Sequence, residues 1–321
     1  MLNRARRHPD VKTWIAEALS DERYYCDSPP HWNGAETSLQ AFDRHKRIER
    51  FLVKRFNNRK SVLDSNCGKV AVRLGSCHPY ARCFSGACPD CNRALQRYFV
   101  AETANLLKGD FTSSKEVSAL SLVNGFWRYL EQADLNELQS DAKSLLRKVG
   151  IRYAMGGVDL SYNQEGRSAG YWCGQIWAFV FSDDLDWADQ LRGHHRRMVL
   201  LEKYSFQLRE LLPYSTKRPV MVKPYDGNPD GAAYALKSTF NRRVSYVQEK
   251  VVDGVTRTCR NTSNQPLRVA ERVELYPFLN QQGLASRIFL MGIRPTRTDQ
   301  GISLVKLRSK TGISESSETP S

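Results

Sequence analysis

Four cysteines lie within one short stretch of the chain, and this cluster constrains the fold more than any other feature. The stretch runs for fifteen residues, from Cys77 through Cys83 and Cys88 to Cys91. Only Pro and Asp separate the last two cysteines, and such a close pair with a turn between lets both sulfurs face one ion, as tetrahedral zinc requires. In a reducing compartment the cluster indicates metal ligands and not disulfides. The spacing therefore predicts a zinc knuckle, with free buried thiols as the alternative.

Three zinc ligands follow from this spacing, and the fourth is open to choice. Cys77 is the preferred fourth ligand, with the adjacent His78 and the more distant Cys67 as substitutes. Four protein ligands close the coordination sphere and leave no position for a catalytic water, so the zinc is expected to be structural. The residues after Cys91 continue as a helical pattern, so we expect the site to cap a helix.

The chain also carries a large net positive charge. It has 48 Lys and Arg against 34 Asp and Glu, a formal net charge of +14. Such a surplus favours a nucleic-acid partner, because each neutralised phosphate releases condensed counterions; solubility alone is the alternative explanation. No apolar run approaches the roughly 20 residues that span a bilayer, and the first residues lack the apolar core of a secretory signal. We expect a soluble cytoplasmic protein without a membrane partner.

Basic side chains gather in a few segments. Apolar residues at helical spacing in 37–56 lie beneath a basic face, which predicts an amphipathic helix. A merely solvated face is the alternative, but the basic run continues toward the cysteines, which favours phosphate contact. Further arginines follow Cys91, occur in a long helix expected at 187–212, and end a helix expected at 229–243. The residues expected to contact nucleic acid are Arg47, Arg50, Lys54, Arg55, Arg93, Arg97, Arg192, Arg196, Arg197, Arg242 and Arg243.

Short apolar segments that alternate with helical ones predict an α+β fold, with helices packed on a mostly antiparallel sheet beside the small zinc module. The strands are expected at 70–74, 117–123, 153–163, 170–181 and 218–225. We expect a peripheral arm and the basic helix in 1–60, the zinc-knuckle module in 61–110, an α+β nucleic-acid-binding domain in 111–300, and a polar disordered tail in 301–321.

The order of these features resembles that of rolling-circle replication initiators of plasmids and filamentous phages, which are HUH endonucleases. The resemblance covers about residues 77–295 and is carried by the cysteine knuckle, strands such as GGVDLSYN, a Trp-rich strand and the pattern Tyr234-x-x-Lys237. It implies that Tyr234 attacks a DNA phosphodiester. Lys237, three residues on, would share its helix face and reach the same phosphate. The alternative is that Tyr234 is a core aromatic.

The resemblance also implies a catalytic metal, and here the chain departs from the family. In that family, the strand that binds the metal carries the pattern His-hydrophobic-His. The matching stretch of this chain has Gln175 and Trp177 at those two positions. Strand alternation places both on one face, and Asp159 takes a position that resembles the family's acidic third ligand. Asp159 and Gln175 could offer oxygens to Mg²⁺ or Mn²⁺, but Trp177 would fill the pocket with apolar bulk. Trp177 and Trp172 could also stack unpaired bases, although core packing is commoner.

Three functions remain open at this point. The preferred hypothesis is a zinc-containing DNA-binding protein derived from an initiator, without nicking activity. It would bind single-stranded or hairpin DNA at an origin, in a mobile element or within a larger assembly, in a bacterial cytoplasm or nucleoid. The second is an active, divergent initiator that nicks single-stranded DNA through Tyr234 with Mg²⁺ or Mn²⁺. The third is a zinc module that binds RNA or protein.

Overall fold

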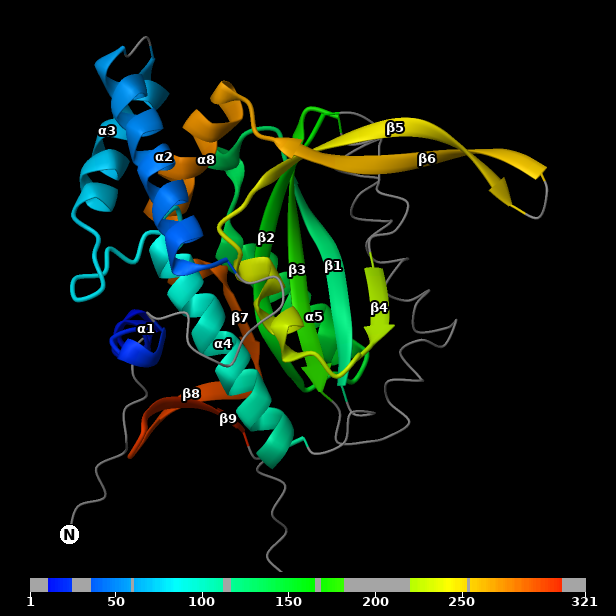
Figure 1. Cartoon of the computed structure of the whole chain (residues 1–321). Coiled ribbons are helices and arrows are strands. Elements are labelled where there is room, and N and C mark those ends of the chain that lie inside the picture. The colour runs from blue at the N-terminus through cyan, green and yellow to red at the C-terminus, as the bar shows by residue number, and fades with distance from the viewer. Residues whose placement is uncertain are drawn as a thin grey trace, which may run out of the picture.

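A computed structural model of the chain contains helices packed on a curled, mixed sheet (Figure 1). It describes residues 11–24, 36–58, 61–111, 117–164, 169–181, 220–252 and 255–307. The α-helices are α1 (Val11–Ala18), α2 (Ser38–Asn57), α3 (Val62–Gly75), α4 (Pro89–Gly109), α5 (Leu135–Lys148) and α8 (Val269–Gln282). Short 3-10 helices are η1 (Glu22–Tyr24), η3 (Leu130–Gln132), η4 (Pro229–Leu236) and η5 (Ala285–Arg287). The predicted α+β class is confirmed.

Seven strands form the main sheet. They are β1 (Val117–Trp127), β2 (Tyr153–Asn163), β3 (Tyr171–Phe181), β4 (Val220–Pro224), β5 (Asn241–Val252), β6 (Val255–Pro266) and β7 (Ile288–Met291). The order is β4-β1-β3-β2-β5-β6, and β7 also pairs with β2. Only the β2–β5 pair is parallel. Strands β8 (Ile293–Thr298) and β9 (Gly301–Lys306) form a separate hairpin.

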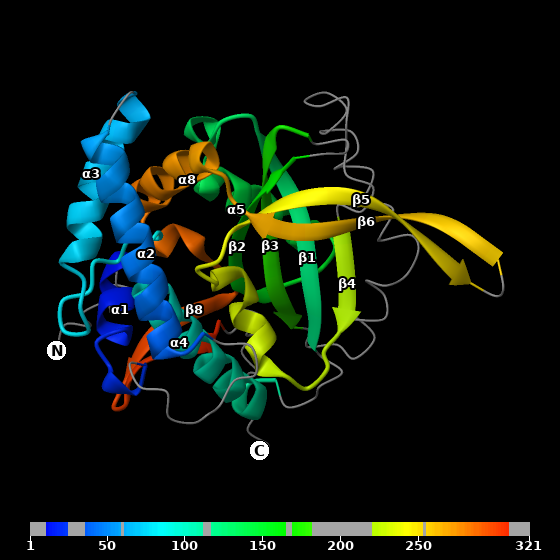
Figure 2. The same cartoon turned by 45° about the horizontal axis from the view of Figure 1, so that its top comes forward.

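The two faces of the sheet are covered by different elements. Helix α5 packs behind β1 and β3, while α4 and η4 lie on the opposite face (Figures 1 and 2). Thr103 of α4 donates to the sulfur of Met155 on β2, which fixes α4 over the sheet. Side chains alternate between the two faces along a strand, so every second residue from Met155, including Asp159, faces α4 and η4.

The predicted amphipathic helix at 37–56 forms as α2, and its start follows a clear local signal. Thr37 accepts from the backbone of Gln40 and the Gln40 side chain accepts in return from the Thr37 amide, which is a capping box. Helix α4 begins at Pro89, directly after Cys88, so the cysteine pair does lie at a helix start. Among the described helices, none is both long and apolar enough to cross a membrane.

Several predicted elements are wrong. Residues 70–74 lie inside α3, because the apolar positions face α2 and the core at helical spacing and not at strand spacing. The described part of the expected N-terminal arm, residues 11–24, is not peripheral, since Trp14 and Ile15 of α1 are buried in the core. The tail expected from residue 301 begins with β9, where Ile302 and Leu304 are buried. The helix expected at 187–212 lies outside the described residues.

The helix expected at 229–243 is also different: it is the 3-10 helix η4, and residues 241–243 already belong to strand β5. Strands β5 and β6 pair over their whole lengths, but β5 pairs with β2 only at Ser161–Asn163. The two strands therefore leave the body as a long ribbon (Figures 1 and 2). The sequence does carry a signal for this ribbon, because Asp253-Gly254 is a preferred hairpin turn.

Two glycines allow η4 to lie directly on the sheet. A Cβ on Gly157 of β2 would come within 2.6 Å of Leu236 and 2.8 Å of the Arg287 carbonyl oxygen. A Cβ on Gly231 of η4 would come within 2.7 Å of the Phe179 ring. Close contact at both ends of η4 therefore fixes the position of its residues over β2 and β3.

We expect Gly157→Ala to destabilise the protein by about 1–3 kcal/mol, because the added methyl overpacks the contact between β2 and η4. Gly109→Ala is the matched control, since a Cβ there meets nothing within 4 Å and the residue ends helix α4. It is expected to be neutral or slightly stabilising. Urea unfolding of both variants measures the difference, and equal stabilities would contradict the close packing of η4.

Candidate functional site

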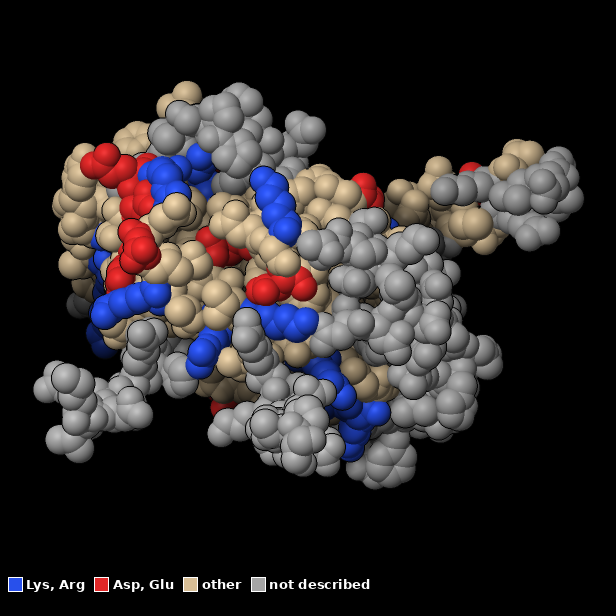
Figure 3. Space-filling view, turned by 90° about the horizontal axis from the view of Figure 1, so that it is seen from below, with Lys and Arg blue, Asp and Glu red and all other residues tan. Residues whose placement is uncertain are grey.

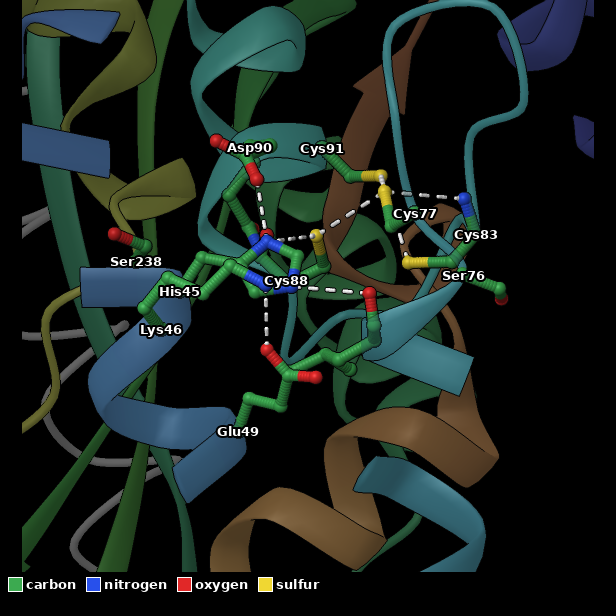
Figure 4. Close-up of polar contacts among 12 residues, drawn as sticks. His45, Lys46, Glu49, Ser76, Cys77, Cys83, Cys88, Asp90, Cys91 and Ser238 are labelled. Atoms are coloured by element: carbon green, nitrogen blue, oxygen red, sulfur yellow. Dashed lines mark hydrogen bonds and ion pairs between the residues drawn. The ribbon is translucent and has the colours of Figure 1, made fainter. Parts of the chain in front are cut away.

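The four clustered cysteines bring their sulfurs together in one compact group (Figure 4). The Sγ of Cys77 lies 3.6 Å from that of Cys91 and 3.6 Å from that of Cys88, and the Sγ of Cys83 lies 3.7 Å from that of Cys91. Four metal–sulfur bonds of about 2.3 Å, directed to the corners of a tetrahedron, would hold the sulfurs about 3.8 Å apart. The cluster can therefore hold a metal ion such as zinc.

Three backbone segments supply these four sulfurs. Cys77 follows the end of α3, Cys83 lies in the loop, and Cys88 and Cys91 flank the first residues of α4. The Cys83 amide donates to the Cys77 sulfur at 3.4 Å, as it would to a metal-bound thiolate. Cys77 is thus confirmed as the fourth member of the group. The substitute Cys67 instead donates to the Leu63 carbonyl at 3.5 Å.

The thiols influence one another strongly. Hydrogen bonds from Cys83, Cys88 and Cys91 lower the pKa of Cys77 well below its ordinary value. Hydrogen bonds with Cys77 and Cys83, together with burial, raise the pKa values of Cys88 and Cys91 well above theirs. The hydrogen bond with Cys77 raises the pKa of Cys83, but those with Cys88 and Cys91 lower it, and the net shift is downward. Without a cation, the group therefore keeps protons on Cys88 and Cys91, and a metal ion has to displace them.

His45 of α2 joins this centre, although the sequence places it among basic surface residues. Its ring is buried, and Nδ1 contacts an Asp90 carboxylate oxygen and lies 3.9 Å from the Cys88 sulfur (Figure 4). Nε2 lies 3.0 Å from the Leu74 carbonyl oxygen. Burial is the largest single influence and lowers the pKa of His45, but the hydrogen bond and charge of Asp90, the charge of Cys77 and the contact with the Leu74 carbonyl together outweigh it, so the pKa is raised. Both acceptors suit a protonated ring, which ties α2 to α4 beside the cysteines.

A second group of polar residues meets on the sheet face beneath η4. Asp159 of β2 lies directly opposite Gln175 of β3. The buried Asp159 carboxylate pairs with the Lys237 Nζ at 2.8 Å. Its other oxygen, Oδ1, is buried without a hydrogen-bond partner among the described residues. The ion pair joins the strand to the residue that follows η4.

Tyr234 lies at this site as well and is not a core aromatic. It is 47% exposed, and the Lys237 Nζ lies 4.2 Å from its ring centroid. The centroids of Tyr234 and Trp177 are 5.6 Å apart. Lys237 directly follows η4, and its amide donates to the Tyr234 carbonyl oxygen at 3.4 Å, so the three-residue spacing of the 3-10 helix extends to Lys237 and brings the two residues to the same side. Trp172, by contrast, is fully buried and donates to Glu274 at 2.9 Å, so it belongs to the core.

Gln175, the second predicted oxygen ligand, is engaged at both ends of its amide. Its Nε2 donates to the Ser121 hydroxyl at 2.5 Å, and its Oε1 accepts from Arg243 at 3.2 Å. Arg243 comes from the base of the ribbon, where β5 meets β2. The predicted oxygens of Asp159 and Gln175 thus each face a cationic side chain.

Arg287 links the two groups, and no pattern in the sequence distinguishes it from other arginines. Its side chain is almost completely buried and donates to the Asn92 side-chain oxygen in α4. It also donates to the carbonyl oxygens of Ala235 at 2.5 Å and Lys237 at 2.9 Å. Burial lowers the pKa of Arg287 to about 10, against the opposing effect of Asp159. The guanidinium therefore remains charged at neutral pH.

The predicted nucleic-acid contacts divide into exposed and internal residues. Arg47, Arg50 and Lys54 are exposed on α2. The prediction is wrong for Arg93 and Arg97, which are buried and donate to the backbone carbonyls of Glu36 and Arg23. Arg93 and Arg97 are four residues apart on α4, so they share one face of the helix, and that face is buried. Arg55, which pairs with Asp64 at 2.6 Å, and Arg242 are half-buried, and Arg192, Arg196 and Arg197 lie outside the described residues.

We expect removal of the metal to destabilise the fold. A ligand present at a thousand times its Kd contributes about 4 kcal/mol to the free energy of unfolding, and a chelator or Cys91→Ser should remove a contribution of this size. Cys259→Ser is the control, because Cys259 lies on the ribbon away from the cluster. Elemental analysis and thermal unfolding measure the outcome. One metal ion per chain retained in Cys91→Ser would contradict the assigned ligands.

Metal binding is also expected to weaken as the pH falls. Because the pKa values of Cys88 and Cys91 are raised, both thiols are protonated at neutral pH without metal. Each must release a proton on binding, so a higher proton concentration opposes the reaction. Competition with a coloured zinc chelator at pH 6, 7 and 8 gives the affinity, and a flat profile would exclude proton release at the cluster.

Comparisons of the chain with models of protein families, with curated proteins and with solved structures found no match. The cysteine cluster and the polar group on the sheet face are the two features of the described residues that bear on its function.

Proposed function

We propose that this chain is a zinc-stabilised protein that binds DNA, single-stranded or in a hairpin, without cutting it. The observation that carries the proposal is the Asp159–Lys237 ion pair beneath η4. The pair places a lysine where the resemblance to initiators would place a catalytic metal. Binding of a polyanion and loss of the metal chemistry then have one physical basis, a fixed cation in the site.

Zinc is the proposed occupant of the cysteine cluster. Four sulfur ligands in a tetrahedral arrangement suit zinc, which needs no redox chemistry and no particular electronic geometry. The four thiolates leave no open position for water, so the ion supports the fold and not a reaction. Its place at the start of α4 gives that support to the helix that carries Asn92, and hence to Arg287.

Support for a nucleic-acid partner comes from the placement of the charge. On the face seen from below, basic and acidic side chains are interspersed (Figure 3). Helix α2, in contrast, exposes Arg47, Arg50 and Lys54. The β5–β6 ribbon, residues 241–266, has five basic and two acidic residues. A two-stranded ribbon of this kind fits the major groove of a duplex, such as the stem of a hairpin.

Support for the absence of cutting comes from the predicted metal ligands. A divalent ion at Asp159 would have to displace Lys237, and one at Gln175 would compete with Arg243. Hard divalent cations also prefer several oxygen ligands, and Trp177 contributes none. The site therefore favours holding a phosphate beside Lys237 and Arg243 over polarising it with a metal.

The active initiator is the second candidate, and the exposure of Tyr234 favours it. The phenol is accessible and Lys237 lies over its ring, so a nucleophile and a cation are adjacent. Lys237 would then have to serve both Asp159 and the phosphate. An RNA partner would fit the same cations. Competition among single-stranded DNA, duplex DNA and RNA at defined salt ranks the affinities of the three nucleic acids.

We expect the protein to bind single-stranded or hairpin DNA and leave it intact. Supercoiled plasmid and a labelled single strand are incubated with the protein and Mg²⁺ or Mn²⁺, with Tyr234→Phe as the matched variant. The expected result is salt-sensitive binding by both proteins, since phosphate contacts release counterions, and no covalent adduct. A protein–DNA adduct that disappears in Tyr234→Phe would overturn the non-cutting proposal. Binding indifferent to salt would remove its phosphate basis.

A further inference from the structure

A cleft runs along α2, and it belongs neither to the cysteine cluster nor, apart from Lys237, to the group on the sheet face. One part of it, with a volume of about 340 Å³, lies between α2, α8 and the segment 238–241. A second part, of about 510 Å³, continues along α2 to Gln96 of α4 and to Lys237. Arg44, Arg47, Ser238 and Thr239 line both parts, so the two are continuous. Each volume is within the range of small-molecule sites.

The charge of this cleft is strongly positive. Its ionised lining consists of four cations and one carboxylate, namely Arg44, Arg47, Lys237, Arg272 and Glu36. Glu36 is already used, because it pairs with Arg44 at 2.6 Å and accepts from the Ser238 hydroxyl at 2.9 Å. Among the described residues, Arg47 and Arg272 have no carboxylate partner. These two arginines are therefore available to an anion.

Arg272 is held in place before any ligand arrives. Its guanidinium carbon lies 4.2 Å from the Phe51 ring centroid, which orients the planar group. Its Nε is buried and has no hydrogen-bond partner among the described residues. A buried donor without an acceptor is costly, and a phosphate oxygen could satisfy it. Arg47, across the cleft on α2, is exposed at the rim.

Aromatic rings lie beside these arginines. Phe51 and Tyr276 line the part of the cleft next to α8 with their centroids 6.2 Å apart, and Phe240 lines it from the segment before β5. Burial raises the pKa of Tyr276, so its hydroxyl remains a donor at neutral pH. Cations beside aromatic rings are the combination that proteins use for single strands, because every base has a stacking face.

We propose that this cleft holds a phosphate and an unstacked base of a single-stranded nucleic acid, and that the strand continues past Lys237 toward Tyr234. The inference rests on the proposed nucleic-acid function and adds the site and the path. Arg47 and Arg272 bind the phosphate, and the ring group at Phe240 and Tyr276 receives the base. Lys237 belongs both to the cleft and to the sheet-face group, which makes the path continuous.

The test measures binding of a fluorescein-labelled single-stranded oligonucleotide to the full chain by anisotropy. Arg47→Glu and Arg272→Glu are compared with Arg147→Glu, an identical charge change on the exposed side of α5 across the sheet. We expect the two cleft variants to bind about tenfold more weakly or worse, with a salt slope smaller by about 0.7 for each phosphate that is no longer neutralised. Arg147→Glu should bind nearly as the wild type does. Thermal unfolding confirms that each variant is folded, and Arg272→Lys keeps the charge if Arg272→Glu does not fold.

A second measurement locates the base directly. An oligonucleotide with 5-iodouracil is photo-crosslinked to the wild type, and mass spectrometry maps the attachment, which is expected at Phe240 or Tyr276. Equal weakening by Arg147→Glu and Arg47→Glu would overturn the cleft while leaving nucleic-acid binding intact. Crosslinks confined to the β5–β6 ribbon would also overturn the proposed cleft and leave nucleic-acid binding intact. A wild type that binds no nucleic acid would overturn the proposed function itself.

Discussion

The buried guanidinium of Arg287 is the interaction on which the arrangement of this molecule depends. A charge removed from water is stable in a protein only when partners surround it, and leaving a buried polar group without its hydrogen-bond partner typically costs about 1–3 kcal/mol, more when the group is charged. Arg287 finds its partners in Asn92 of α4 and in the carbonyl groups of Ala235 and Lys237. Because those groups belong to different elements, satisfying one side chain fixes α4 and the end of η4 together.

This link gives the distant cysteine cluster a role at the sheet face. Asn92 directly follows Cys91, so a metal that orders the start of α4 also orders an acceptor of Arg287. Arg287 in turn fixes the backbone of Lys237, whose side chain pairs with Asp159. The proposed zinc thus supports the proposed binding site through one continuous set of hydrogen bonds. The close contact between Gly157 of β2 and Leu236 of η4 also fixes η4 over the sheet, since it leaves little room for η4 to move.

Local signals in the sequence are sufficient to predict the cysteine cluster and much of the sheet. The spacing of Cys77, Cys83, Cys88 and Cys91 predicts one site, and the four sulfurs meet. Apolar runs predict β1, β2 and β3, whereas the register that sets Asp159 opposite Gln175 comes from the pairing of the strands in the structure. Contacts between distant segments were not accessible in this way. Nothing local shows that Arg93 turns inward to Glu36, that His45 meets Asp90, or that Arg287 is buried.

We propose that fixed cations, and not a catalytic metal, occupy the sheet-face site. Anomalous diffraction from crystals soaked in Mn²⁺ tests it most directly, because zinc and manganese are distinguished at their absorption edges. The account predicts a zinc peak among the four cysteine sulfurs and no manganese peak near Asp159, with Lys237 still paired to the carboxylate. A manganese ion bound by Asp159 and Gln175, with Lys237 displaced, would contradict it.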